Sequence, residues 1–545
     1  MQQVDLVPGS FQLIDVDGTS TSKHASGRVQ DVVLNPVPSE HPDDPLNWSP
    51  NRKRLSIASV CLYTFAIGIA SAAIYSVLDA IEEDTELTLD DLNSGTGYMF
   101  LAFGWGCLFW QPLALRYGKR PVYLTSVLAT MAIQIWAPYT RTNGMWIANK
   151  IFQGFFGAPI ESLCEISVTD LYFTHERGTY IALYGLLLAG SSFLAPVFAG
   201  FINDGQGWQW VLYWCAILCG ISFVILFFSM EETNFYREQR SGIISFGPGP
   251  KLPEEPSLAT QRVVAGETKY ENSNTSSVAP TTVSQRAKSY PQKLKVYDPT
   301  SPKYTGRLQS MVFRPLILFS FPVIVYAGFS YGSNLIWFNV LNGTASLILS
   351  GKPYGFSSSM VGLSYLSPLL GAVLGAVYTG PLGDWIVLRI ARRNDGVLQP
   401  EYRLWLFSLS VILIPGGLVL WGVGAAHQIH WFGLIIAMCV ISFTNILGLQ
   451  LSLSYCIDCY RELSGTAIVT VILIRNTMSF AIGYGITPWV TNLGLQNAFV
   501  VAACAGLLQA LSFLLMIKFG YRLRKASQTR YRAYAEEPMT ADVVY

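Results

Sequence analysis

The sequence has few charged residues. Asp, Glu, Lys and Arg make up 13% of its 545 residues, against roughly 25% in an ordinary soluble domain, whereas 51% are hydrophobic. A single hydrophobic core stops growing at about 250–300 residues, so one soluble core does not explain apolar composition over this length. The sequence therefore predicts an all-α integral membrane protein. The net charge is +1, so the sequence has no marked excess of basic residues, which argues against nucleic acid as a partner.

Other absences exclude several classes of function. None of the five histidines lies deep in an apolar run and none forms a histidine box, so we expect no metal, no cofactor and no membrane enzyme such as a desaturase or acyltransferase. The nucleotide-binding pattern G-x-x-x-x-G-K-[ST] is missing, which argues against an ATP-driven pump. All nine cysteines fall in or beside apolar runs, so no disulfide framework is expected. The polar first fifty residues do not look like a cleaved signal peptide.

Long apolar runs predict the membrane-spanning helices. A span of about 20 residues crosses the hydrocarbon core of a bilayer, and twelve such runs can be marked off. They lie near 55–79, 93–115, 121–139, 145–171, 179–201, 209–229, 316–341, 359–381, 404–424, 431–457, 465–489 and 496–518.

A polar stretch divides these spans into two six-helix halves. Residues 231–313 are rich in Ser, Thr, Pro, Lys and Glu and cannot bury enough apolar surface to fold alone. We predict an N-terminal tail over 1–53, one half over 54–230, a disordered linker over 231–313, a second half over 314–519 and a C-terminal tail over 520–545.

Basic residues predict the orientation of the chain in the membrane. The short loops after spans 2, 4, 8 and 10 carry Arg116, Lys119, Arg120, Arg177, Arg389, Arg392, Arg393, Arg403 and Arg461. The loops on the other side carry only Arg141 and Lys352. Because loops rich in Lys and Arg stay in the cytoplasm, both termini and the linker are predicted to be cytoplasmic.

The loops after spans 2 and 8 carry related motifs. The second reads Gly380-Pro-Leu-Gly-Asp384, and the first contains Arg116-Tyr-Gly118-Lys-Arg120. Together they resemble the G-x-L-x-D-R-x-G-R-R loop of the major facilitator superfamily, which recurs in both halves of those transporters. The resemblance implies a twelve-helix fold in two halves, and conformational gating by Asp384, Arg116, Arg120 and Gly118.

Further motifs narrow the resemblance to the fungal twelve-span drug:proton antiporter family. They are Pro42–Trp48, Lys150–Gly154, Ala195–Gly200 and Glu231–Asn234. The resemblance associates Gly190, Pro196 and Gly200 in span 5 with helix bending and antiport, although Ala195 replaces the usual glycine. Residues 154–162 and 168–178 also look like the branch that includes organic-cation and polyamine carriers.

Span 4 contains two acidic residues that are candidates for coupling. Glu161 and Glu165 are four residues apart and therefore share one face of a helix. Ionisable groups inside a membrane span are costly and are functional by default. Because two neighbouring buried carboxylates repel each other, we expect at least one to hold a proton near neutral pH. The alternative is that one of them only locks a half together through a polar neighbour. Pro159 in the same helix frees a backbone carbonyl and permits a bend.

Two cations lie in spans. Lys150 precedes Glu161 by eleven residues, about 16 Å along a helix, so the two cannot pair directly. The family resemblance gives the basic residue at this position a role in proton transfer, and Lys150 is a candidate for it. Arg475 in span 11 is expected to make an internal hydrogen bond to polar groups near the end of its span.

These observations favour a secondary active transporter of small, cationic or amphipathic organic molecules that works as a monomer in the lipid bilayer and uses the proton gradient. Export of drugs, toxins or secondary metabolites is the first hypothesis. Import of organic cations such as polyamines is the second, and a nutrient-sensing receptor is a remote third. The resemblance favours the plasma membrane over the vacuolar membrane. Asn342-Gly-Thr344 is a possible glycosylation site close to the membrane.

Overall fold

The described part of the chain is built almost entirely of helices. A computed structural model describes residues 8, 11–12, 41, 43–235, 292, 294–295, 308–393, 397–460 and 463–536. Most of the predicted linker lies outside this part of the chain. Within it, a two-stranded antiparallel ladder pairs β1 (Phe11–Gln12) with β2 (Val397–Leu398).

The helices of the first half follow one another with short connections. They are η1 (Pro45–Asn47), α1 (Pro50–Ala72), η2 (Ala73–Ser76), α2 (Leu78–Asp84), α3 (Leu89–Tyr117), α4 (Lys119–Trp136), η3 (Ala137–Tyr139), α5 (Asn143–Gly157), α6 (Pro159–Leu171), α7 (Thr174–Gln206) and α8 (Trp208–Ser229).

The second half has more interruptions. Its elements are α10 (Leu308–Ile317), η4 (Leu318–Ser320), α11 (Pro322–Ser350), α12 (Ser358–Ser364), α13 (Leu366–Val377), the π-helical η5 (Tyr378–Leu382), α14 (Gly383–Arg393), η6 (Pro400–Leu409), α15 (Ser410–Leu418), the π-helical η7 (Val419–Val423), α16 (Gly424–Ala426), α17 (Trp431–Cys459) and α18 (Ser464–Glu536).

Local sequence signals explain several helix boundaries. Thr88 and Asp91 form a capping box at the start of α3, which satisfies backbone N–H groups that have no partner inside the helix. Proline occupies the first position of α1, α6 and α11, where its missing N–H costs nothing. Gly118, at φ 111°, separates α3 from α4.

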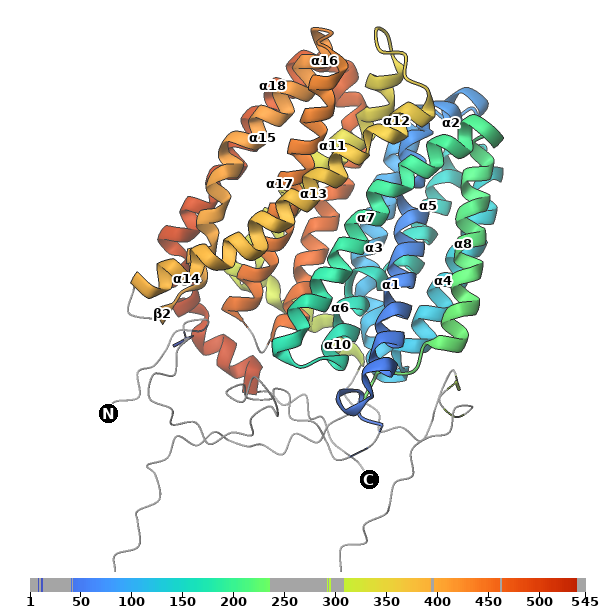
Figure 1. Cartoon of the computed structure of the whole chain (residues 1–545). Helices are drawn as coiled ribbons and strands as arrows, with labels where there is room; N and C mark the ends of the chain where they lie inside the picture. Colours follow the sequence, from blue (N-terminus) through green and yellow to red (C-terminus); the bar gives the residue numbers. More distant parts are fainter. Residues whose placement is uncertain are drawn as a thin grey trace, which may run out of the picture.

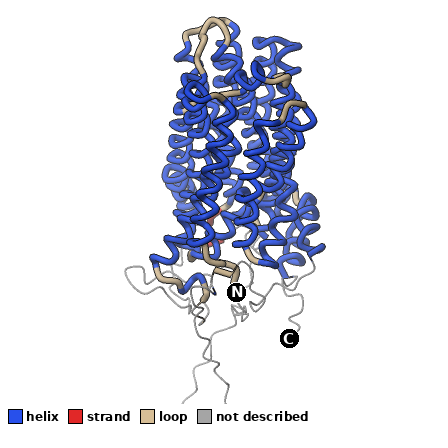
Figure 2. The backbone as a smooth tube through the Cα atoms, turned by 90° about the vertical axis from the view of Figure 1, so that its right-hand side faces the viewer, coloured by secondary structure: helices blue, strands red, loops and turns tan. Residues whose placement is uncertain are grey.

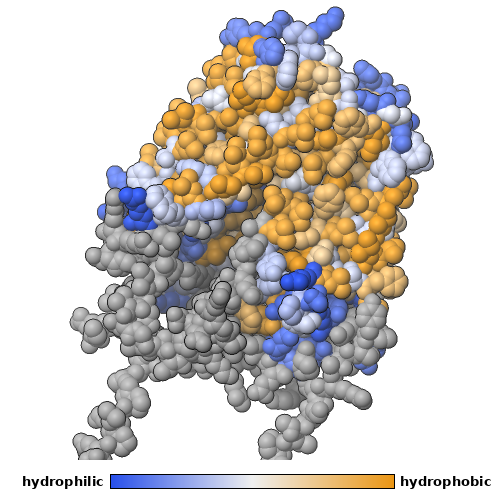
Figure 3. Space-filling view, in the orientation of Figure 1, coloured by the Kyte–Doolittle hydropathy of each residue, from blue (hydrophilic) through white to orange (hydrophobic). Residues whose placement is uncertain are grey.

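The helices run between two faces of the molecule (Figures 1 and 2). We call the face where α1 begins, α8 ends and α10 begins the linker face, and the opposite face the distal face. In Figure 1, α1–α8 lie to the right, α15, α17 and α18 lie to the left, and α12–α13 cross diagonally from α7 to α14. Figure 3 shows an apolar surface between polar ends, as expected of a protein surrounded by lipid.

The helices agree with the predicted membrane fold. Eight helices or helix runs in the described part are long and apolar enough to cross a membrane, and the pair α10–α11, which is bent by 90°, makes nine. The twelve predicted spans are compatible with this, because α18 contains two apolar stretches separated at Gly494 (φ 70°), while α4 and the broken pair α5–α6 match predicted spans 3 and 4.

The halves pack tightly near the distal face. A Cβ added at Gly200 in α7 would clash with the carbonyl oxygen of Ser358, and one added at Gly362 in α12 would clash with the carbonyl of Pro196. Asn203 Nδ2 donates to Ser358 Oγ at 3.0 Å. Glycine permits this close approach because it has no side chain. Toward the linker face the two groups of helices diverge (Figure 1).

Two segments just beyond predicted spans are enclosed by other helices. The helix α18 continues beyond residue 519 to Glu536, and Arg524 in this extension is buried against Glu401, with its Nε donating to Oε1 at 2.9 Å. Asn342 is also buried, and its Oδ1 accepts a hydrogen bond from Tyr365 at 3.2 Å. The asparagine of the possible glycosylation site is therefore enclosed by the helices.

Candidate transport site

An ion pair joins the two halves. Glu161 in α6 accepts a charge-assisted hydrogen bond from Arg475 in α18, and their side chains are 13% and 6% exposed. The second terminal nitrogen of Arg475 donates to the hydroxyl of Tyr331 at 2.6 Å, and the guanidinium lies 4.8 Å from the centre of that ring. Tyr331 and Arg475 come from the second half, so the contact to Glu161 links elements that are far apart in the sequence.

A break between α5 and α6 positions Glu161. Pro159 begins α6 and has no N–H to donate to the carbonyl of Phe155, which instead accepts from the indole Nε1 of Trp110 at 2.7 Å. Glu161 thereby falls in the first turn of a new helix, where the positive end of the helix dipole favours a carboxylate. The predicted bend at Pro159 is present as this break.

Glu165 has a different environment from Glu161. It lies one turn further along α6, toward the linker face, and is half-buried. Among the described residues, no hydrogen bond or ion pair to its carboxylate is found. The two predicted acids therefore differ in kind, because Arg475 compensates one of them and the other has no counter-charge in this part of the chain.

Lys150 belongs to a separate polar cluster. Its side chain is buried in α5, donates to Gln153 Oε1 at 2.9 Å and lies 4.6 Å from the centre of the Trp146 ring. Gln153 in turn donates to the carbonyl of Ala70 at 2.9 Å. Lys150 lies on the distal side of Glu161, as its sequence separation requires, and is not brought together with the two acids.

The residues predicted to gate the transporter lie at the linker face. Gly118 is required by its positive φ and by Glu232, whose carboxylate accepts from the backbone N–H groups of Lys119 and Arg120, both at 3.0 Å. Arg120 is buried and donates to the carbonyl of Phe227 at 2.7 Å.

The other two predicted gating residues are less enclosed or less defined. Arg116 is half-buried with its guanidinium 5.7 Å from the centre of the Tyr117 ring. Asp384 begins α14 together with Gly383, and its side chain lies outside the described part of the structure. Their proposed gating role stays a prediction.

The span 5 motif divides into contacting and non-contacting residues. Pro196 and Gly200 form the tight contact with α12, and the carbonyl of Pro196 also accepts from Ser76 Oγ at 2.8 Å. A Cβ at Gly190 would meet nothing within 4 Å. Within α7, the packing between halves therefore uses Pro196 and Gly200 but not Gly190.

Sequence reasoning missed the role of Arg475. It was expected to bond near the end of its own span, whereas it pairs with an acid of the other half. The signal was present, because a lone arginine deep in an apolar run needs a counter-charge. Glu161 was an available partner, but only the tertiary fold shows which acid is within reach.

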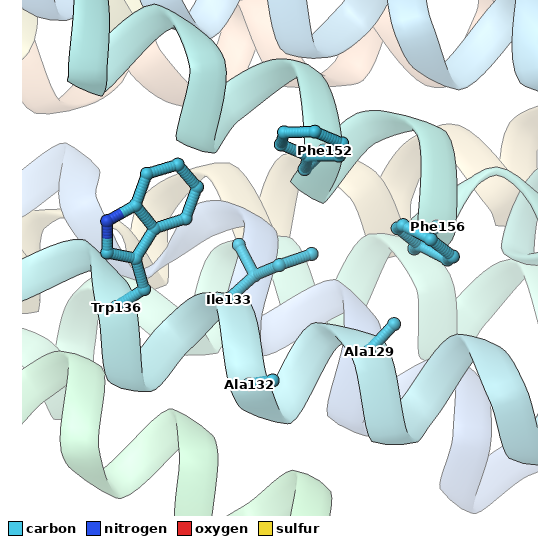
Figure 4. Close-up of a pocket in the computed structure, with 6 residues that line it drawn as sticks. All are labelled: Ala129, Ala132, Ile133, Trp136, Phe152 and Phe156. Atoms are coloured by element: carbon cyan, nitrogen blue, oxygen red, sulfur yellow. The ribbon is translucent and has the colours of Figure 1, made fainter.

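A hollow on the surface, away from the ion pair, does not resemble a transport site. It is a surface groove of about 370 Å³ between α4 and α5, lined by Trp136, Ile133 and two alanines on one side and by Phe152 and Phe156 on the other (Figure 4). Phe152 is 50% exposed. The described lining has no charged side chain, unlike the ion pair between the halves.

The chain is similar in sequence to known proteins. The profile of the Major Facilitator Superfamily matches residues 60–476. The chain is 28% identical to the uncharacterized MFS-type transporter C1271.10c of Schizosaccharomyces pombe, covering 97% of this chain and 95% of that protein. It is 25% identical to Protein HOL1 of Saccharomyces cerevisiae, covering 95% of both.

Among solved structures, the D-xylose-proton symporter superposes with a TM-score of 0.52 at 14% identity, over 84% of this chain and 97% of that one. At this identity the likeness concerns the fold alone. The family match makes the protein a membrane transporter of small molecules and not an enzyme. The chain belongs to the Major Facilitator Superfamily.

Proposed function

We propose that this protein exports small organic cations or amphipathic cationic molecules in exchange for protons. The proposal rests on the pairing of Glu161 with Arg475 across the halves and on Glu165 one turn away, which has no partner among the described residues. Alternating access needs an interaction between the halves that a ligand can change. This cluster supplies such an interaction in the interior of the bundle.

The charge balance of the cluster supports exchange. When both acids are ionised, two carboxylates and one guanidinium leave one uncompensated negative charge. Burying net charge in a low-dielectric interior is unfavourable, so the binding of one proton or one monovalent organic cation to the cluster is favoured. Both together would leave a net positive charge. The two cations therefore compete for the same site, which is the condition for antiport.

Arg475 links this competition to the movement of the halves. When Glu165 binds neither a proton nor a substrate cation, the negatively charged cluster holds Arg475 firmly, and Arg475 keeps the halves joined. A proton on Glu165 cancels the uncompensated negative charge of the cluster, which weakens the hold on Arg475 and with it the link between α6 and α18. A cation at Glu165 repels Arg475 and acts in the same direction. The face of Tyr331 gives either cation an additional favourable surface.

The orientation follows from the basic loops. We place the linker face in the cytoplasm and the protein in the plasma membrane as a monomer, with the vacuolar membrane as the alternative. The close contacts of α7 with α12 then seal the outside, and Glu165 lies on the cytoplasmic side of the ion pair. This is the side from which an exported substrate arrives. Lys150, distal to the pair, is proposed to assist proton transfer.

A second candidate, import of organic cations such as polyamines, is favoured by the same unpartnered acid. The net negative charge of the cluster would attract a polyamine from either side. Import and export differ in the direction of the coupled proton, so a transport measurement separates them.

The test uses the full chain in proteoliposomes with an imposed pH gradient. Tetraphenylphosphonium and spermidine serve as probes, and D-xylose serves as an uncharged control. Uphill movement of a cation against the proton flux, lost in Glu165→Gln and Glu161→Gln but kept in the exposed control Glu83→Gln, is the expected result. Cation movement in the same direction as protons would replace export by import. A cation flux that is unchanged by both substitutions would contradict the assignment of Glu161 and Glu165 to the transport site.

A further inference from the structure

The C-terminal end of α18 is rich in basic residues. Between Lys518 and Ala535 the sequence has six Lys and Arg side chains and no Asp or Glu. This extension of α18 lies at the linker face, where its red end continues below the second half (Figure 1). The positive-inside rule accounts for basic residues on the cytoplasmic side, but it requires neither a helix nor an arrangement on one face.

One face of the extension is docked on the second half. Arg524 is fully buried, and its guanidinium donates to the two carboxylate oxygens of Glu401 at 2.9 and 2.7 Å. The hydroxyl oxygens of Ser527 and Tyr460 are 2.6 Å apart. Residues three apart lie on the same side of a helix, so Arg524 and Ser527 share the docked face. These contacts hold the extension at a defined rotation about its axis.

The exposed face of the extension continues the lipid-facing side of the span. Leu511 and Leu515 are 37% and 61% exposed, and exposed leucines in a membrane span contact lipid. Seven residues make almost two complete turns, so Lys518 lies below Leu511, and Arg522 lies below Leu515. Lys525 follows Lys518 by another seven residues, and all three cations are exposed. We call Lys518, Arg522 and Lys525 the basic face.

The basic face begins at the depth of the lipid head groups. Lys518 is the first charged residue after the apolar stretch that follows Gly494. At 1.5 Å per residue, Arg522 lies about 6 Å further along the axis, which is close to the thickness of one head-group layer, roughly 5–7 Å. The rings of Phe519 and Tyr521 are 39% and 45% exposed at the same level, as is typical of residues at a membrane interface.

No acidic side chain neutralises the basic face. Among the described residues, none pairs with Lys518, Arg522 or Lys525, whereas the neighbouring Arg524 has Glu401. Lys and Arg clusters directly beyond a membrane span attract the anionic phospholipids of the cytoplasmic leaflet. Guanidinium and ammonium groups also form charge-assisted hydrogen bonds with phosphate oxygens. Position and charge together therefore favour a phospholipid head group as the partner.

We propose that the basic face of α18 binds the head groups of anionic phospholipids in the cytoplasmic leaflet. The Arg524–Glu401 pair holds the helix at its rotation, and the basic face contacts the lipid phosphates. This site is separate from the ion pair between the halves, and it anchors the cytoplasmic end of the second half at the membrane surface. The inference uses the proposed cytoplasmic position of the linker face and goes beyond the proposed transport.

The experiment measures lipid preference beside the basic face in phosphatidylcholine proteoliposomes that contain the full chain. A fluorophore on Tyr521→Cys, in a background without the native cysteines, is quenched by a nitroxide near the head group of either phosphatidylserine or phosphatidylcholine. Lys518→Gln, Arg522→Gln and Lys525→Gln together remove the basic face, and Lys518→Arg with Lys525→Arg keeps its charge. Arg530→Gln is the matched control, an exposed arginine about 12 Å beyond Arg522 on the same extension.

We expect phosphatidylserine to bind at least about fivefold more tightly than phosphatidylcholine, the factor that one basic residue near an anionic surface supplies. This preference should fall as ionic strength rises, disappear in the triple glutamine variant, and persist in Arg530→Gln and in the double arginine variant. Equal quenching by the two lipids in the wild type, or a preference that survives the triple substitution, overturns the proposal.

Inorganic phosphate separates a lipid site from a site for a soluble anion. Added at constant ionic strength, it should leave the lipid preference unchanged, and a preference abolished by phosphate would assign the basic face to a soluble anion and overturn the lipid proposal. No substrate is transported in this measurement. A failed lipid test therefore leaves the proposed export standing, and failed export leaves the lipid site standing.

Discussion

The two halves resemble each other at the linker face and differ in the interior. In the first half, Lys119 at the start of α4 pairs with Asp170 at the end of α6. In the second half, Arg403 near the start of η6 lies 3.6 Å from Asp458 at the end of α17. Each pair joins the third and fourth predicted spans of its half. The repeat thus extends to individual ion pairs.

In the interior, the two halves carry opposite charges. The first half contributes the acids Glu161 and Glu165, and the second contributes the cation Arg475. Identical charges at this level would repel each other, whereas opposite charges attract. The comparison teaches that duplication suits the scaffold of each half, but the interaction between halves requires that they diverge.

The largest effect on stability should come from breaking the pair between the halves. Arg475→Gln leaves a buried carboxylate without its counter-charge, which costs about 3–5 kcal/mol of unfolding free energy. The reversed pair, Glu161→Arg with Arg475→Glu, should recover part of that loss. Thermal unfolding in detergent measures both. A reversed pair no more stable than Arg475→Gln would show that the contact contributes little.

The loss of unfolding free energy on breaking each ion pair at the linker face should be larger for the pair whose cation is more buried. Lys119 is 1% exposed and Arg403 is 21% exposed. Lys119→Met should cost about 1.5–3 kcal/mol, as for a hydrogen bond to a charged group. Arg403→Met should cost at most about 1 kcal/mol, as for an exposed pair. The same unfolding measurement decides, and equal losses would mean that the likeness of the two pairs extends to their energetics.

The distal contact should respond to added volume. Gly200→Ala places a methyl group against the carbonyl of Ser358, and overpacking of this kind costs about 1–3 kcal/mol. Separating α7 from α12 relieves this strain and opens the distal side. In a background without the native cysteines, Asn339→Cys in α11 should therefore react faster with a thiol reagent added from the distal side. Gly190→Ala, where a Cβ meets nothing within 4 Å, should leave the rate unchanged.

The smallest loss of stability should belong to Glu165→Gln. Because this acid has no partner among the described residues, its neutralisation removes an uncompensated charge from the interior and should leave the unfolding free energy unchanged or raise it. Proton-driven transport should nevertheless be lost. Comparison with Glu161→Gln in the same membranes checks the contrast, and a Glu165 variant as unstable as the Glu161 variant would mean that the two acids share one role.

The sequence predicts much of this architecture because its signals are local. Apolar length predicts the spans, Pro159 predicts the break before α6, and helical spacing predicts that Glu161 and Glu165 share a face. The partner of Glu161 could not be predicted, since 314 residues separate it from Arg475 and only the packing of two halves brings them together. The burial of Asn342 depends in the same way on Tyr365, which lies between α12 and α13.

Counting protons released when a cation binds tests the central claim most directly, because the claim is that one negative charge serves proton and substrate in turn. Purified protein in weakly buffered detergent, with a pH indicator, is titrated with tetraphenylphosphonium at the pH where the wild type is protonated. The account predicts about one proton released per cation bound by the wild type and none by Glu165→Gln. Binding of the cation to the wild type without proton release would contradict it.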